Sequence, residues 1–244
     1  IIGIEAYVAP STRKSRVQEF WGTSRDAGDP DAEGGKDVSG GGRYTHMTMW
    51  EKESEGLHNI FRLSSLASYE GYYMKPRMDR ELMGQYSGGI IASTGCPSGE
   101  VQTRLRLGQF EEACQAASDY RDIFGRENYF CELMDHGVPI EKQVRSDLLK
   151  LAKKLDIPLL VTNDSHYVTE DQADAHDALL CVGVGRNKDD PNRFRFNGSG
   201  YYIKSSEQMR SLFPDHPEAC DNTLLLTEMI GSYDEVFKYV DRMP

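Results

Sequence analysis

The feature that most constrains the fold of this chain is a repeated order, in which a short apolar segment is followed by an amphipathic one. The pairs of segments are 90–93 with 102–124, 129–134 with 140–155, and 158–162 with 170–182. Continuous apolar runs between helices are typical of parallel strands that helices cover. The chain is therefore predicted to have an α/β fold. We favour a barrel over an open sheet, because several of these strands end in potential ligands.

Other elements are predicted from local patterns. Apolar residues open the chain at 1–8, alternate over 44–49, and recur with helical spacing over 56–68, which indicates two strands and an outer helix. A closing helix is expected at 217–230, after an excursion of loop and short strands over 188–212. The segment 22–42 is rich in glycine and aspartate without apolar periodicity, which predicts a mobile loop.

Composition and charge narrow the class of protein. The chain has 244 residues, a net charge of −11 and five scattered cysteines, none of them in a CxxC pair. No segment approaches the roughly 20 apolar residues of a membrane span, and none resembles a signal peptide. We therefore expect a cytoplasmic protein that neither crosses a membrane nor coats nucleic acid with a basic surface. Because the chain opens on an apolar run without Met, turn or cap, we also expect it to continue a longer polypeptide.

The strongest chemical signal is a strand that runs out into Asp164-Ser165-His166. Residues two apart on a strand point to the same side, so the carboxylate and the imidazole could form half of a divalent metal site. The alternative is that Asp164 caps the following helix while His166 makes one hydrogen bond. The spacing alone leaves both interpretations open.

Three other residues are candidate ligands. Glu5 lies at the end of an Ile-rich strand, where a buried carboxylate would need a cation or hydrogen-bond donors. His46 lies on one face of its strand, and a single histidine there is more often structural than a ligand. Cys96 follows an apolar strand in a Gly-Cys-Pro turn, and its thiol could bind a borderline or soft metal or could simply pack as a small apolar group.

Basic residues supply two further candidates. Arg104 and Arg106, on the helix after Cys96, are the local candidates for phosphate binding. Residues 193–196, Arg-Phe-Arg-Phe, could track a single nucleic-acid strand by charge and stacking. The same alternation is expected of a half-buried strand with Phe inward and Arg outward, and we favour that interpretation.

Seven segments, taken in order, resemble one family. They are GIEAY, YTHMT, STGCPSGEVQTRLRLGQ, YFCELMDHG, TNDSHYV, DPNRFRF and GYYIKS, and they span nearly the whole chain. The chain resembles the PHP (polymerase and histidinol phosphatase) domain of the alpha subunit of bacterial replicative DNA polymerase III. The similarity is closest to the actinobacterial form. The segments around Cys96 and Asp164 are the long, specific ones.

The resemblance implies a distorted seven-stranded α/β barrel with up to three divalent metals, Zn, Mn or Fe, at the mouth of the strands. Carried over by motif, the ligands are Glu5, His46, Cys96, Asp164 and His166. Glu5, Asp164 and His166 would be catalytic. The family's Glu bridges two metals, and the His and Cys complete one of these sites. The resemblance gives no ligand role to the segment Asp135-His136, which we expect to be structural.

The chain departs from the family at its start. The His-x-His motif and the next Asp and His ligands of the family precede Glu5 and are absent, with the first strands of the barrel. We expect residues 1–231 to be an N-terminally incomplete PHP domain. Residues 232–244 would then be a linker towards a polymerase palm domain.

The family implies two functions for such a domain. One is a metal-dependent 3′–5′ exonuclease that removes mispaired nucleotides from the primer-template DNA 3′ end during replication, with Arg104 or Arg106 contacting phosphate. The other is a non-catalytic, metal-stabilised scaffold that supports the polymerase and docks a separate exonuclease. A small-molecule phosphatase, as in the histidinol phosphatase branch, is disfavoured by the alpha-subunit motifs. The implied partners are the rest of the alpha subunit, DNA, and the sliding clamp of a nucleoid-associated replisome through other domains.

Overall fold

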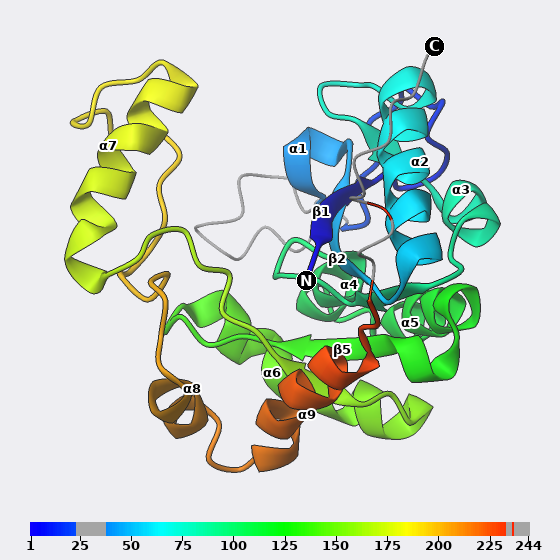
Figure 1. Ribbon diagram of the computed structural model, residues 1–244. Coiled ribbons are helices and arrows are strands. Elements are labelled where there is room, and N and C mark those ends of the chain that lie inside the picture. Colours follow the sequence, from blue (N-terminus) through cyan, green and yellow to red (C-terminus); the bar gives the residue numbers. More distant parts are fainter. Residues whose placement is uncertain (23–37, 233–235, 237–244) are drawn as a thin grey trace.

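The computed structural model describes residues 1–22, 38–232 and 236 of the chain, which form a mixed α/β structure around one six-stranded sheet (Figure 1). The strands of the described residues, in sheet order, are β3 (Arg77–Met78), β1 (Gly3–Val8), β2 (Thr45–Glu51), β4 (Ile90–Ser93), β5 (Tyr129–Leu133) and β6 (Leu159–Val161). The predicted α/β class is confirmed. Six strands are seen in this part of the chain, against the seven that the resemblance implies for a complete barrel.

Strand direction follows burial. β4, β5 and β6 pair in parallel, as their continuous apolar runs predict, and every residue of β4 and β5 is buried. β2 runs antiparallel to both of its neighbours, β1 and β4. Its residues alternate between buried and half-buried, which is typical of an antiparallel strand with one apolar face. The carboxyl ends of β1, β4, β5 and β6 therefore meet the amino end of β2 at one edge of the sheet.

The helices lie mainly against one face of the sheet. The elements are α1 (Ser39–Gly42), α2 (Ser54–Glu70), α3 (Arg80–Gln85), α4 (Glu100–Arg106), α5 (Phe110–Phe124), α6 (Pro139–Leu155), α7 (Ala173–Val184), α8 (Ser206–Leu212) and α9 (Pro217–Met229), with short 3-10 turns at Arg126–Asn128 and Glu170–Gln172. The main apolar core joins α2, α5 and α6 to side chains such as Met47, Met49 and Ala92. In Figure 1, α7 stands apart from the other helices.

Two predicted segments, one helix and one stretch of short strands, need correction. The predicted helix over 102–124 is two helices, because Gly108 adopts φ of 72° between α4 and α5. No strand forms over 188–212, a fully described segment, which contains irregular chain and α8 instead. The Arg-Phe alternation at 193–196 is therefore not a half-buried strand. Arg193 is the buried residue and Phe194 the exposed one, opposite to the predicted pattern.

Two predicted segments fall largely beyond what the structure describes. Of the predicted mobile loop 22–42, residues 23–37 lie outside the described residues, and Ser39–Gly42 form the short α1 turn. Of the predicted linker 232–244, only residues 232 and 236 are described. Among the helices that the structure describes, none has both the length and the apolar character needed to cross a bilayer.

Candidate metal centre

The face of the sheet opposite the main layer of helices is apolar at one end and polar at the other. The pairing register places Trp50 beside Ile91, and these side chains pack with Phe130, Leu160 and Leu226 of α9 in a small apolar cluster. Towards the carboxyl ends of the parallel strands, the same face carries polar side chains. They are Glu5, Tyr7, His46, Thr48, Ser93 and Glu132. Every sequence-predicted ligand lies on or just beyond this polar end.

Glu5, His46 and Cys96 come together there from three separate segments. The Nδ1 atom of His46 lies 2.7 Å from Oε1 of Glu5 and 3.5 Å from Sγ of Cys96. The sulfur lies 3.9 Å from the same Glu5 oxygen. Each residue offers one ligand atom, and the three atoms all lie within 4.8 Å of one another. In the described part of the chain, these three residues form a group that could hold a metal ion.

Backbone contacts hold the Cys96 turn against β2. The N–H of His46 donates to the carbonyl of Ser98 at 3.1 Å, and His46 forms an isolated parallel bridge with Gly99. Gly95 has φ of 79°, and a Cβ atom there would lie 2.9 Å from the carbonyl oxygen of His46. Only glycine fits this close, left-handed position, so the glycine of the TGCPSG motif sets how near the thiol approaches the imidazole.

Two tyrosines support the ring of His46. Tyr7 pairs with His46 across β1 and β2, and its ring centroid lies 5.3 Å away in an edge-on arrangement. The ring of Tyr44 stacks on that of His46 at 5.7 Å and contacts the ring of Tyr7 edge-on at 4.7 Å. The imidazole is therefore held on the strand with its Nδ1 atom turned towards Glu5, while 52% of the Glu5 side chain remains exposed.

Burial and charge keep the Cys96 thiol protonated. Burial raises the pKa of this thiol far above its ordinary value, and the nearby charges of Glu5 and Asp164 raise it further. A hydrogen bond from the backbone of Ser98 opposes the shift only in part. Because a metal binds the thiolate, loading this site would release the thiol proton.

Asp164 and His166 form a second polar pair beside the first group. Oδ1 of Asp164 lies 3.3 Å from Nε2 of His166, and about a third of each side chain is exposed. Burial raises the pKa of Asp164, but the hydrogen bond and charge of His166, with the charges of His136 and His46, bring it below its ordinary value. The hydrogen bond to Asp164 raises the pKa of His166, against desolvation.

The alternative role of Asp164 as a helix cap is wrong. The 3-10 turn at Glu170–Gln172, which leads into α7, is capped by Thr169, whose side chain accepts from Gln172 in a capping box. Asp164 instead has φ of 20° and turns its carboxylate to His166, on the side of the sheet where Cys96 and His46 lie.

Glu132 forms the floor of the polar end and was missed by sequence reasoning. It is 3% exposed and accepts hydrogen bonds from Thr162 at 2.5 Å, from Thr48 at 3.3 Å and from Ser93. Burial raises the pKa of its carboxyl. The hydrogen bonds from the three hydroxyl groups lower this pKa in part, and the negative charge of Asp164 raises it further. The sequence did carry a signal for Glu132, which is an acidic residue inside the apolar run of β5. A carboxylate buried in such a strand requires hydrogen-bond donors or a cation nearby.

The other singled-out residues lie around the edges of the site. Arg104 is half-buried, donates to Gln109 at 2.9 Å and stacks over the ring of Trp21 at 3.8 Å. Arg106 is half-buried at the end of the same helix, α4. Their role in phosphate binding stays a prediction. Asp135 pairs with Arg145 at 2.7 Å, while His136 is buried against Glu141 at 2.5 Å.

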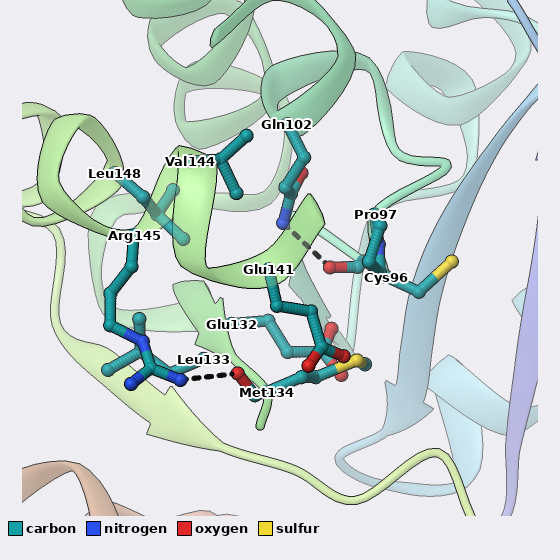
Figure 2. A pocket seen from close by; sticks show the side chains of 11 residues that line it. Cys96, Pro97, Gln102, Glu132, Leu133, Met134, Glu141, Val144, Arg145 and Leu148 are labelled. Atoms are coloured by element: carbon teal, nitrogen blue, oxygen red, sulfur yellow. Dashed lines mark hydrogen bonds between the residues drawn. The ribbon is translucent and has the colours of Figure 1, made fainter. Parts of the chain in front are cut away.

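A narrow cavity lies behind the Cys96 turn, between β5 and α6 (Figure 2). Its volume is about 20 Å³, enough for about one water molecule and too small for a nucleotide. Figure 2 shows the sulfur of Cys96 pointing away from Gln102 and Arg145, whose side chains line this cavity. Gln102 donates to the carbonyl of Gly95 at 2.7 Å and so braces the turn from behind.

The donor set fits a divalent metal. One imidazole nitrogen, one carboxylate oxygen and one thiol sulfur are the ligand types found in zinc sites, and imidazole and carboxylate also suit manganese and iron. Asp164 and His166 offer the same two kinds of donor next to them. These five residues could therefore hold metal ions, and the chemistry of the donors does not select one metal.

Comparison with known proteins supports the family resemblance. The family model for the PHP domain matches residues 1–136. The chain is 59% identical over 245 residues to "DNA polymerase III subunit alpha" of Saccharopolyspora erythraea, covering 100% of this chain and 20% of that protein. It is 53% identical over 246 residues to the protein of the same name in Mycobacterium leprae, with the same coverage.

A more distant relative, "DNA polymerase III subunit alpha" of Thermus aquaticus, is 35% identical over 232 residues, covering 94% of this chain and 18% of that protein. The chain thus spans about a fifth of the length of the curated relatives it matches. The resemblance inferred from the motifs is confirmed, including its similarity to an actinobacterial protein. The match of the family model over more than half of the residues shows that the chain belongs to the PHP domain family.

Proposed function

We propose that this chain acts within a replicative DNA polymerase alpha subunit as a metal-dependent 3′–5′ exonuclease, which removes mispaired nucleotides from the growing DNA strand. The observation that carries the proposal is the convergence of Glu5, His46 and Cys96, whose ligand atoms lie within 4.8 Å of one another at the polar end of the sheet. The Asp164–His166 pair beside them extends this donor set.

The residues divide into holding and orienting roles. Glu5, His46 and Cys96 would hold one divalent metal, and Glu5, Asp164 and His166 would supply donors to others, up to three in a complete domain. Bound metals would activate water and stabilise negative charge on the phosphate oxygens. Tyr7 and Tyr44 fix the ring of His46, so that its nitrogen keeps its direction when a metal binds.

The net charge of −11 is compatible with this activity. Carboxylates at the site repel a phosphodiester unless cations neutralise them, so the protein would accept DNA only after metal loading. Arg104 and Arg106 lie on the helix that follows the Cys96 turn and would contact phosphate from there. Metal binding would thus precede binding of the DNA 3′ end.

The test is excision of a mismatched 3′ nucleotide by the complete polypeptide that carries this chain. Asp164→Asn keeps the size of the side chain but removes its charge, and we expect excision to fall by at least about 100-fold, the lower range for loss of a catalytic group. Asp147→Asn is the matched control, because Asp147 lies on α6, its side chain is 43% exposed and it pairs with Lys150 at 2.8 Å. Unchanged excision by Asp164→Asn would contradict the proposal.

The thiol favours one alternative, a metal-stabilised scaffold that docks a separate exonuclease. Cysteine is a common ligand in structural zinc sites, where the metal contributes to folding rather than to chemistry. Melting of the complete polypeptide with and without a chelator, set beside the excision assay, separates the two functions. Metal-dependent stability without excision supports the scaffold, whereas metal-dependent excision supports the nuclease.

The remaining proposals concern the domain bounds, the partners and the location. We propose that residues 1–231 form the PHP domain and residues 232–244 a linker to the polymerase palm domain. The partners would be the rest of the alpha subunit, primer-template DNA, and a sliding clamp that contacts other domains. The site of action would be the cytoplasm, at the nucleoid-associated replisome. Fluorescence microscopy of the tagged complete polypeptide tests this location, and a signal away from the nucleoid would contradict it.

A further inference from the structure

A cluster of aromatic rings lies directly beside His166. The ring of Phe196 lies 4.6 Å from that of His166 in an edge-on arrangement, and the ring of His176 lies 5.3 Å away. Phe196 also contacts His176 at 5.2 Å, and Tyr167 contacts His176 at 5.4 Å. These rings come from the Asp164 turn, from α7 and from the Arg-Phe-Arg-Phe segment.

The rings line a half-open pocket of about 310 Å³, which we call the aromatic pocket. Its main lining residues are Tyr167, Asp174, His176, Asp177, Leu180 and Phe196. The volume falls at the lower end of the range for small-ligand sites, about 300–1,000 Å³. It is also far larger than the cavity behind Cys96, so a planar ring system fits here and not there.

The two carboxylates of the pocket already have cationic partners. Asp177 receives two hydrogen bonds of 2.6 Å from the buried guanidinium of Arg193, and Asp174 pairs with Lys188. The wall is therefore close to neutral, and it still offers oxygen acceptors to N–H donors. A phosphate would gain nothing from it, whereas a nucleobase would gain both ring stacking and acceptors for its amino groups.

Two neighbouring groups extend this chemistry. The hydroxyl of Tyr167 is buried, so this residue would meet a base through its ring, which lies 5.4 Å from that of His176. Phe194 contacts Phe196 at 5.5 Å and is 59% exposed, so its ring is accessible beside the pocket. A second base could stack there.

We propose that the aromatic pocket is a subsite for the nucleobase of the 3′-terminal nucleotide of an unpaired DNA strand, with Phe196, His176 and Tyr167 as stacking residues. The inference rests on the proposed function, because the phosphate of that nucleotide would then face His166 and Asp164. An unpaired end is the form that fits, since a base inside a duplex cannot offer its face to a protein ring.

Binding is measured with the metal-loaded complete polypeptide carrying Asp164→Asn, which is the parent of this assay and in which excision is expected to be too slow to consume the probe. The probe is a single-stranded oligonucleotide with the fluorescent base 2-aminopurine at its 3′ end, whose fluorescence stacking quenches. Phe196→Leu retains an apolar side chain but removes the ring, and we expect its Kd to rise about tenfold with loss of quenching. Phe61→Leu, at an exposed phenylalanine of α2, is the matched control and should bind like the parent.

A second oligonucleotide, abasic at its 3′ end, separates a stacking role from a structural one. Its Kd for the parent should be about tenfold weaker than that of the intact strand, while Phe196→Leu should bind both strands equally. Equal binding of both strands by the parent, or quenching that survives in Phe196→Leu, would overturn the proposal. The binding assay does not depend on excision. Absence of metal-dependent excision would therefore contradict the proposed nuclease function but not the proposed binding of a base in the aromatic pocket.

Discussion

Glu132 joins three segments at the polar end of the sheet through hydrogen bonds to its carboxylate. Its carboxylate is fully buried, and three hydroxyl groups donate to it from β2, β4 and the end of β6. Burial raises its pKa above the ordinary value of 4.5. The folded state therefore binds a proton at Glu132 more tightly than the unfolded state does. The corresponding stability is present below about pH 4.5 and is lost as the pH rises through the raised pKa.

This linkage predicts the behaviour of Glu132→Gln, which stays neutral at every pH. The variant should match the parent near pH 4 and become progressively more stable than the parent as the pH rises above about 4.5. Urea unfolding of the chain at a series of pH values measures the difference. Glu127→Gln, at an exposed residue of the turn after α5, is the control. A difference that shrinks with rising pH would contradict this account.

The sequence suggested the individual candidate ligands but did not show that they meet in space. Sequence patterns alone left Glu5, His46 and Cys96 each with a structural alternative, because a strand position does not reveal which side chains face it. The family motifs singled them out together, and the pairing of β1 with β2 places Glu5 and His46 on one face. Glu132 escaped notice, because its three hydroxyl partners lie on strands distant in sequence.

At the scale of elements, one close approach fixes the position of α2 on the sheet. A Cβ atom at Gly56 would lie 1.7 Å from the carbonyl oxygen of Gly89, the residue before β4. No side chain fits there without moving the helix. Gly84 of α3 is the opposite case, an exposed helical glycine with no atom within 4 Å of its Cβ position.

We therefore predict opposite effects for two identical substitutions. Gly56→Ala should destabilise the chain by about 1–3 kcal/mol, the usual cost of overpacking. Gly84→Ala should stabilise it by about 0.5–1 kcal/mol, because alanine loses less backbone entropy in a helix. The midpoints of urea unfolding test the pair. Equal shifts of the same sign would show that packing at Gly56 has no special role.

Arg193 ties the irregular segment after α7 to that helix. Its guanidinium is buried, makes a two-point contact with Asp177 and donates to the carbonyl of Lys188 at 2.9 Å. Sequence alternation predicted a strand here with Arg exposed. That prediction was wrong because a guanidinium can be buried when its charge is paired and its N–H groups are hydrogen-bonded, and a two-residue period does not reveal such pairing.

Arg193→Lys tests this anchoring role. A lysine cannot make the two-point contact, so amides of residues 188–198 should exchange with solvent at least about tenfold faster, a loss of about 1.4 kcal/mol of local stability. Arg186→Lys, at an exposed arginine paired with Asp190, should leave exchange unchanged. Hydrogen exchange read by mass spectrometry makes the comparison, and equal protection in both variants would contradict the anchoring role.

Over the whole molecule, the sequence predicted the α/β class and the parallel pairing of β4, β5 and β6 from apolar runs. It did not predict the reversed direction of β2 or the two-residue strand β3, because direction and short pairings depend on contacts between distant segments. The break at Gly108 was equally hidden within a continuous helical pattern. Most helices cover one face of the sheet, and α9 covers the apolar end of the other face, which leaves its polar end open for ligands.

The central claim is that Glu5, His46 and Cys96 bind a divalent metal, and metal analysis tests it most directly. The complete polypeptide is loaded with Zn²⁺, freed of excess by gel filtration and measured by atomic spectrometry. His46→Ala and Cys96→Ser should each retain about one equivalent less than the parent. Cys220→Ser, at a buried thiol of α9 outside the site, should retain the full amount. Equal zinc in all four proteins would contradict the claim.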